Sequence, residues 1–268
     1  MSAICRSMMP FCAAERRDLD GWEWPMTVSR HHLALALLVA IWLISLGLGF
    51  VFGKLDRRRL NRLPLRIRLL SSAILVVCAL IWWRPAAIDT PLAGYAALLC
   101  LGMSLSFVGD VIMSGIVPLP QDVLVGMGTF GAAHVVYIVA YSRLAAVLGL
   151  RSWALPAATL AGYYALAIPL WWKLVRSPDQ PLAATWASLG YSLVLATMAG
   201  MAAGVALQEA SLVPLALGGL LFVVSDLLLG HRLFQGGHFV LIGDCIWMTY
   251  ILAQLLIVFS TATGLNLL

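Results

Sequence analysis

Apolar runs of about 20 residues alternate with short polar segments over most of the chain. A helix needs about 20 apolar residues to cross the ~30 Å hydrocarbon core of a bilayer. Lipid also requires every backbone polar group to be paired within the protein, which favours helices. The pattern therefore predicts an all-α, polytopic membrane protein, a bundle of about eight transmembrane helices at 32–53, 67–84, 92–115, 123–142, 152–172, 184–206, 212–234 and 238–260.

Proline and glycine mark the breaks between these runs. We expect loops at "RPAAIDTP" (84–91), "VPLPQD" (117–122) and "RSPDQP" (176–181). The last two spans are separated only by "HRLFQGGH" (231–238), where a Gly-Gly pair predicts a turn. We expect one membrane domain at 32–260, a polar N-terminal extension at 1–31 and a short C-terminal tail at 261–268.

Composition supports the membrane assignment. The chain is 62% hydrophobic and 11% charged, its mean hydropathy is +0.95, and a soluble domain carries about 25% charged residues. The net charge of +5 comes from basic residues beside the spans, so we expect no nucleic-acid partner. The five cysteines show no paired spacing, so we expect neither a disulfide framework nor a thiolate metal site.

The distribution of basic residues predicts an orientation. Segment 54–68 contains seven Lys and Arg residues, more than any other connection between spans. Cytoplasmic loops carry an excess of Lys and Arg. We therefore expect this segment in the cytoplasm and both termini on the opposite side.

Four ionisable side chains lie at depth within the predicted spans, away from the span ends: Asp110, His134, Asp226 and Asp244. Each costs about 2.5–3.5 kcal/mol on insertion scales, and such residues mark functional sites by default. Adjacent spans run in opposite directions, and all four positions then lie in the membrane half that faces segment 54–68. This arrangement predicts one polar cavity open to one face.

Several polar neighbours belong to the same prediction. Ser106 is four residues before Asp110 and shares its helix face. Ser225, Tyr137, and the i, i+4 pair Tyr250 and Gln254 are the other supporting candidates. The alternative for these side chains is interhelical hydrogen bonding without a chemical role.

Two buried carboxylates beside a histidine permit general acid–base chemistry, because acids that share a site titrate apart. The same groups suit a proton-coupled transporter, a lipid-binding membrane protein or a structural bundle. The sequence contains no HExxH, GxSxG or SxxK motif, so nothing in it points to a metal, a cofactor or a serine hydrolase.

Two pairs of segments within the chain also resemble each other in sequence. "FVGDVIMSG" (107–115) resembles "FVVSDLLLG" (222–230), and "YIVAY" (137–141) resembles "YILAQ" (250–254). The related spans are four apart, which predicts a 4+4 internal repeat with both halves in the same orientation. Chance similarity among hydrophobic helices is the alternative.

Four stretches together resemble the YhhN/lysoplasmalogenase family of eight-span membrane proteins: "LSFVGDVIM", "FGAAHVVYIVAY", "GGLLFVVSDLLL" and "MTYILAQLLI". "GYSLVLATMAGMA" in the sixth span is also similar to that family. The resemblance runs from about 40 to 260. It implies hydrolysis of the vinyl ether bond of a lysophospholipid, lysoplasmalogen, in a multi-pass protein of the bacterial inner membrane.

The resemblance also implies roles for the polar residues. One of Asp110 and Asp226 would donate a proton, and the other would stabilise the resulting cation. His134 would orient or activate water, and Tyr250 would support the acid. Which aspartate is the donor stays open, as does the oligomeric state. Asp244 lies outside the family's motifs.

Overall fold

The computed structural model describes residues 30–268, so nearly all of the expected N-terminal extension lies outside the described residues. Eight helices in this range are long and apolar enough to cross a membrane. This confirms the predicted all-α, polytopic bundle. Their bounds are α1 (Arg30–Phe52), α2 (Leu65–Ile81), α3 (Ala93–Met113), α4 (Asp122–Val147), α5 (Ala154–Leu174), α6 (Leu182–Ala206), α7 (Val213–Gln235) and α8 (Ile242–Asn266).

Two boundaries differ from the expected ones. Helix α8 continues to Asn266, with Thr261 and Gly264 buried, so most of the expected C-terminal tail is helical. The expected loop at 84–91 is helical up to Ala87, because α2 continues into a π-helical turn, η1 (Trp82–Ala87). Pro85 lies in this turn and has no N–H to donate, and a wider π turn accommodates the missing bond.

The turn between the last two spans is present as predicted. Gly236 ends α7 with φ +69°, a left-handed conformation that glycine adopts without steric penalty. A second, short 3₁₀ turn, η2 (Ala210–Leu212), precedes α7.

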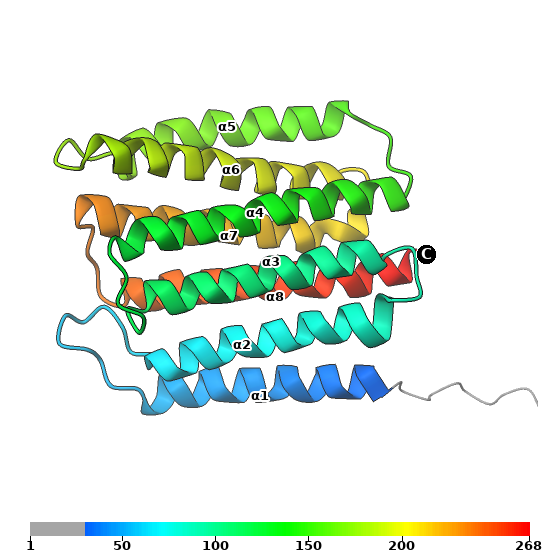
Figure 1. Cartoon of the computed structure of the whole chain (residues 1–268), viewed down its shortest axis with the longest axis horizontal. Helices are drawn as coiled ribbons and strands as arrows, with labels where there is room; N and C mark the ends of the chain where they lie inside the picture. Colours follow the sequence, from blue (N-terminus) through cyan, green and yellow to red (C-terminus); the bar gives the residue numbers. More distant parts are fainter. Residues whose placement is uncertain (1–29) are drawn as a thin grey trace, which may run out of the picture.

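Figure 1 shows the helices side by side in one bundle, with α1 at one edge and α5 at the other. Helix α2 packs against α1, α3 and α8, while α6 packs against α5, α7 and α4. Helices α3 and α4 form one adjacent pair, and α7 and α8 form another. The neighbouring pairs of α1–α4 thus have counterparts in α5–α8, while the 4+4 repeat itself stays a prediction.

Small residues let neighbouring helices approach closely. A Cβ atom at Gly204 would lie 2.6 Å from the Cα of Pro156, and one at Gly200 would lie 3.1 Å from the Cα of Leu160. Both glycines belong to α6 and both contacts belong to α5, which is otherwise the most exposed span. Van der Waals contact at small residues is the usual basis of helix association in membranes.

The connections α1–α2, α3–α4, α5–α6 and α7–α8 lie together at one end of the bundle (Figure 1). We call this end the loop end. The expected cytoplasmic segment 54–68 belongs to it, and the functional site lies in the half of the bundle closest to it.

Candidate functional site

A cavity of about 850 Å³ lies within the loop-end half of the bundle. Residues from α2 through α8 and from the α1–α2 connection line it. Most of its wall is apolar and includes Leu166 and Leu170 of α5, Leu195 of α6 and Leu220 of α7. Two carboxylates from separate helices, Asp110 and Asp226, line the same cavity.

Asp110 lies in the last turn of α3 and is 6% exposed. Its Oδ2 accepts a hydrogen bond of 2.5 Å from the Ser72 hydroxyl of α2 and one of 2.9 Å from the Tyr250 hydroxyl of α8. No salt bridge reaches this carboxyl group from the described part of the chain. Hydroxyl groups are therefore its side-chain partners.

Asp226 on α7 has a different environment. Its Oδ2 accepts a hydrogen bond from the Tyr191 hydroxyl of α6, and the Nε2 of His134 on α4 lies 3.9 Å away. That Nε2 is also 3.1 Å from the Tyr191 oxygen. Tyr191 has one hydroxyl proton and donates it to Asp226, so His134 must donate from Nε2 to Tyr191. The result is a relay from histidine through tyrosine to carboxylate.

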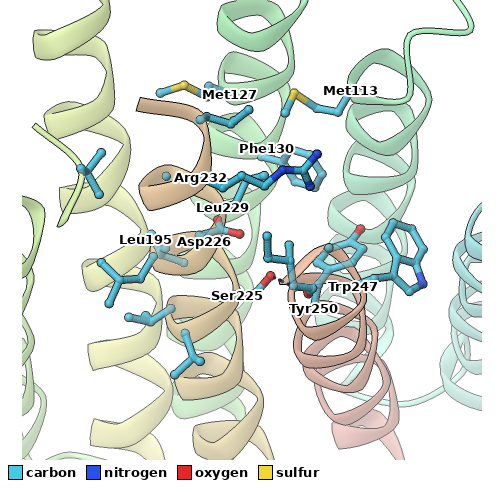
Figure 2. A pocket seen from close by; sticks show the side chains of 18 of the residues that line it. Met113, Met127, Phe130, Leu195, Ser225, Asp226, Leu229, Arg232, Trp247 and Tyr250 are labelled. Carbon is cyan, nitrogen blue, oxygen red and sulfur yellow. Dashed lines mark hydrogen bonds between the residues drawn. The ribbon is translucent and has the colours of Figure 1, made fainter. Parts of the chain in front are cut away.

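Phe222 of α7 joins the two acid clusters. Its ring centroid lies 4.6 Å from that of His134 and 5.3 Å from that of Tyr250, both in edge-to-face geometry. Figure 2 shows Asp226 and Tyr250 on neighbouring helices at the cavity, with Ser225 between them. The Ser225 hydroxyl donates to the backbone oxygen of Ile246 and so ties α7 to α8.

The two acids have related surroundings in the two halves of the chain. Asp110 on α3 is contacted from α2 and α8, and Asp226 on α7 is contacted from the corresponding helices α6 and α4. Each half of the chain therefore contributes one acid, together with a hydroxyl from the preceding helix.

Three of the predicted supporting residues lie behind the cavity wall rather than in it. Tyr137 donates a hydrogen bond of 2.8 Å to Gln254 Oε1, and both side chains are fully buried. The Ser106 hydroxyl has no hydrogen-bond partner among residues 30–268 and does not reach Asp110. His134 is also fully buried and outside the lining, so it faces the cavity only through Tyr191 and Asp226.

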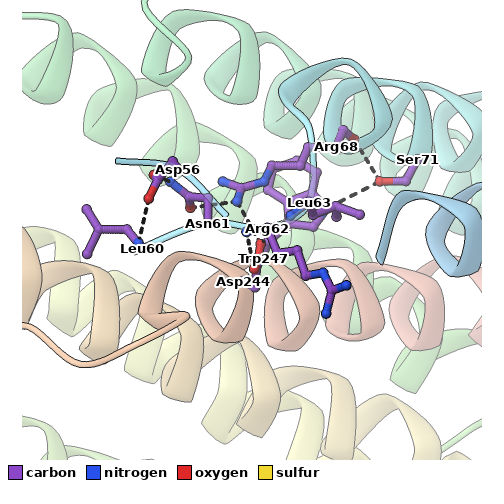
Figure 3. Close-up of polar contacts among 9 residues, drawn as sticks. All are labelled: Asp56, Leu60, Asn61, Arg62, Leu63, Arg68, Ser71, Asp244 and Trp247. Atoms are coloured by element: carbon purple, nitrogen blue, oxygen red, sulfur yellow. Dashed lines mark hydrogen bonds and ion pairs between the residues drawn. The ribbon is translucent and has the colours of Figure 1, made fainter. Parts of the chain in front are cut away.

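Asp244 has a different position from the other acids. Its carboxylate accepts hydrogen bonds from the backbone N–H groups of Arg62 and Leu63, at 2.5 and 3.1 Å, and from the Arg68 guanidinium at 2.9 Å. Figure 3 shows these bonds converging on the first turn of α8. Asp244 is not part of the cavity lining. It anchors the α1–α2 connection over the cavity.

A second acid stabilises the same connection. Asp56 accepts hydrogen bonds from the Leu60 N–H, at 2.7 Å, and from the Asn61 amide, at 2.9 Å (Figure 3). Burial alone would raise the pKa of the Asp56 carboxyl, but these hydrogen bonds outweigh that effect and hold the pKa below its usual value. Asp56 is therefore ionised at neutral pH.

The sequence-based prediction missed two of the hydrogen-bond donors. Ser72 lies in "LLSSAIL", where a small hydroxyl in a span is common and gives little signal. In the sequence, Tyr191 stands out only as part of the motif in the sixth span. Its partner in α7 is 35 residues away, and only the packing of α6 on α7 brings them together.

Within the described residues, no group of three His, Cys, Asp or Glu side chains is arranged to hold a metal ion. No curated protein and no solved structure matches the chain significantly. A model of the YhhN family, in contrast, matches residues 66–261, a range that contains both acid clusters and their hydrogen-bond partners. The chain is thus an integral, multi-pass membrane protein that belongs to the YhhN family.

Proposed function

We propose that this protein is a membrane-embedded hydrolase of the lysoplasmalogenase type, acting on a lysophospholipid with a vinyl ether bond in a bacterial inner membrane. The observation that carries the proposal is the pair of carboxylates, Asp110 and Asp226, that line one apolar-walled cavity in different hydrogen-bonding environments. Membership of the YhhN family, in which the sequence motifs imply this activity, supports it.

Cleavage of a vinyl ether begins with proton transfer to carbon. An acid protonates the alkene carbon that is remote from the ether oxygen, and the adjacent carbon becomes an oxocarbenium ion. Water adds to that carbon and loses a proton to a base, which gives a hemiacetal. The hemiacetal then breaks its bond to the glycerol oxygen, which takes up a proton, and releases a fatty aldehyde and a glycerophospho-alcohol. One proton donor and one carboxylate base are sufficient for these steps.

We assign the proton donor to Asp110. Its carboxyl group is buried and has no cation beside it, so only the hydroxyl groups of Ser72 and Tyr250 offset the cost of burying a negative charge there. Asp226 lies beside a histidine and accepts the Tyr191 hydroxyl, an environment suited to a carboxylate. In this scheme Asp226 stabilises the cation and accepts the proton of the attacking water.

His134 is a positioning residue in this scheme. It is fully buried and reaches the carboxylate through the Tyr191 hydroxyl, so it orients Asp226 and does not touch the substrate. Tyr250 orients the acid in the same way from the other side. Each carboxyl group is held by a tyrosine on a neighbouring helix, which fixes both at the cavity wall.

The cavity fits a single-chain lipid. Leu166 and Leu220 line it and are 63% and 46% exposed on the outer surface of α5 and α7. The cavity wall therefore continues onto the surface that faces lipid tails. An alkenyl chain can occupy this apolar side while its polar end remains toward the loop end.

Two substitutions test the chemistry. Purified protein in detergent micelles should release aldehyde from 1-alkenyl-glycerophosphoethanolamine, and Asp110→Asn and Asp226→Asn should each lower kcat by about 10²–10⁴-fold. Asp179→Asn is the matched control, because Asp179 is exposed on the α5–α6 connection and lies outside the cavity lining. Folding of each variant is checked by its thermal unfolding.

Isotopes test the order of steps. In ²H₂O the aldehyde should carry one deuterium on the carbon next to the carbonyl, and in H₂¹⁸O the released alcohol should keep its original oxygen. Full activity in both Asn variants, or ¹⁸O in the alcohol, would refute the mechanism. A proton-coupled transporter built on the same carboxylates would release no aldehyde in micelles, where no second compartment exists.

A further inference from the structure

Four basic side chains line the cavity near its loop end: Lys54, Arg62, Arg68 and Arg232. Asp56 is the acid among the lining residues at this level. The polar end of the cavity is therefore electropositive, whereas its deeper wall contains the two catalytic carboxylates. A ligand that spans both regions needs an anionic group at one end.

The basic side chains differ in how many of their N–H donors already make hydrogen bonds within the protein. The Arg62 guanidinium donates to the backbone oxygens of Gly53 and Val51, at 3.2 and 3.4 Å, and so belongs to the end of α1. Arg68 donates to Asp244 and to Asn61 through Nη2, and its buried Nε has no partner in the described part of the chain.

Arg232 has the most N–H donors without a hydrogen-bond partner in the described part of the chain. Its guanidinium makes no hydrogen bond or ion pair within residues 30–268, although it lies close enough to Asp56 and Arg68 to interact electrostatically with both. Figure 2 shows Arg232 on α7 with its side chain extending across the cavity above Asp226. Five N–H donors in a fixed fork are thus free to bind a phosphate.

The spacing along α7 fits a glycerophospholipid. Arg232 is six residues beyond Asp226, an axial rise of about 9 Å at ~1.5 Å per residue. In a 1-alkenyl-glycerophospholipid five single bonds separate the vinyl ether oxygen from phosphorus. A phosphate bound at Arg232 would place the vinyl ether at the level of the two carboxylates.

We propose that Arg232, at the electropositive end of the cavity that Arg68 and Lys54 also line, forms a subsite for the phosphate diester of a lysophospholipid. This inference rests on the proposed function for the identity of the lipid. The subsite sets the depth at which the substrate stops and selects phospholipids over neutral glycerol ethers.

The test measures binding without cleavage. The probes are a saturated ether, 1-alkyl-glycerophosphocholine, and 1-alkylglycerol, which has the same chain and no phosphate. Arg232→Gln should weaken binding of the phosphate lipid by roughly 10- to 100-fold, the usual effect of losing a hydrogen bond to a charged group. Binding of 1-alkylglycerol should change less than twofold. Arg232→Lys should fall between Arg232→Gln and the wild type, because it keeps the charge and loses the fork.

The matched control is Arg57→Gln, which removes the same charge from the exposed α1–α2 connection, outside the cavity lining. It should leave both affinities unchanged. Equal losses for Arg57→Gln and Arg232→Gln would overturn the subsite and leave only a surface-charge effect. Equal losses for the two lipids in Arg232→Gln would overturn it as well.

Two further outcomes distinguish a lipid phosphate from free phosphate, and the proposed subsite from the proposed reaction. If inorganic phosphate alone binds as tightly as the phosphate lipid, and loses affinity in Arg232→Gln, the site recognises a free anion and the headgroup assignment fails. If the wild type shows the predicted lipid selectivity but releases no aldehyde from a vinyl ether, the proposed reaction fails and the subsite stands.

Discussion

Replacement of Asp244 by asparagine should release the α1–α2 connection from α8. The Asp244 carboxylate accepts two backbone N–H groups and the Arg68 guanidinium, and the two side chains are 4% and 14% exposed. Asparagine has the same shape but offers only one acceptor atom, so its NH₂ group would face a donor. Breaking a buried pair on one side leaves an uncompensated charge and costs about 3–5 kcal/mol.

The assay is thermal unfolding of the full chain in detergent, followed by circular dichroism. At about 2–4 °C per kcal/mol for a chain of this size, Asp244→Asn should lower Tm by about 6–20 °C. Asp179→Asn, which removes an exposed acid at the same end of the bundle, should shift Tm by less than about 2 °C. The double variant Asp244→Asn/Arg68→Met should be more stable than the sum of its single variants predicts, because no unpaired guanidinium remains. Equal Tm values for Asp244→Asn and Asp179→Asn would contradict the anchoring role.

Other perturbations test separate parts of the structure. A methyl group at Gly102 would collide with the Tyr137 ring, so Gly102→Ala should lower stability by about 1–3 kcal/mol, whereas Gly128→Ala, with open space around it, should be near neutral by the same unfolding assay. Tyr191→Phe should lower kcat by about 10-fold or more with little change in KM, because it removes the link between histidine and carboxylate while leaving the cavity lining apolar. The pKa of Asp56 is held below its usual value of 3.8, so its hydrogen bonds stabilise the connection fully above that pH. Limited proteolysis of the α1–α2 connection should therefore accelerate as the pH falls below about 4, and a pH-independent rate would argue against this contribution.

The hydrophobic pattern predicted the bundle well, because lipid leaves few alternatives to a helix for an apolar run of this length. Most span boundaries fell within a few residues of the observed ones. The errors came from residues that membrane composition does not distinguish. The sequence predicts a helix end before Pro85, although a π turn incorporates this proline, and it predicts a tail at 261–268, although Thr261 packs inside the bundle.

The acids were identifiable from sequence, because a carboxylate within an apolar run carries a high free-energy cost of membrane insertion and is therefore rare. Their roles were not. Asp244 shares the apolar surroundings of Asp110 in the sequence, yet it binds a backbone segment that begins 182 residues earlier. Hydrogen-bond partners such as Ser72 and Tyr191 depend on which helix faces touch, and this information is absent from the periodicity of any single span.

The two-part origin of the cavity has an evolutionary consequence. If each four-helix half contributes one acid, an unduplicated ancestor would have carried a single carboxylate and would have completed its cavity only by pairing with a second copy of itself. In such a pair both acids would have been identical and could not have divided donor and acceptor roles. Fusion of two such copies into one chain would remove that equivalence, so that one acid could keep hydroxyl neighbours while the other gained an imidazole.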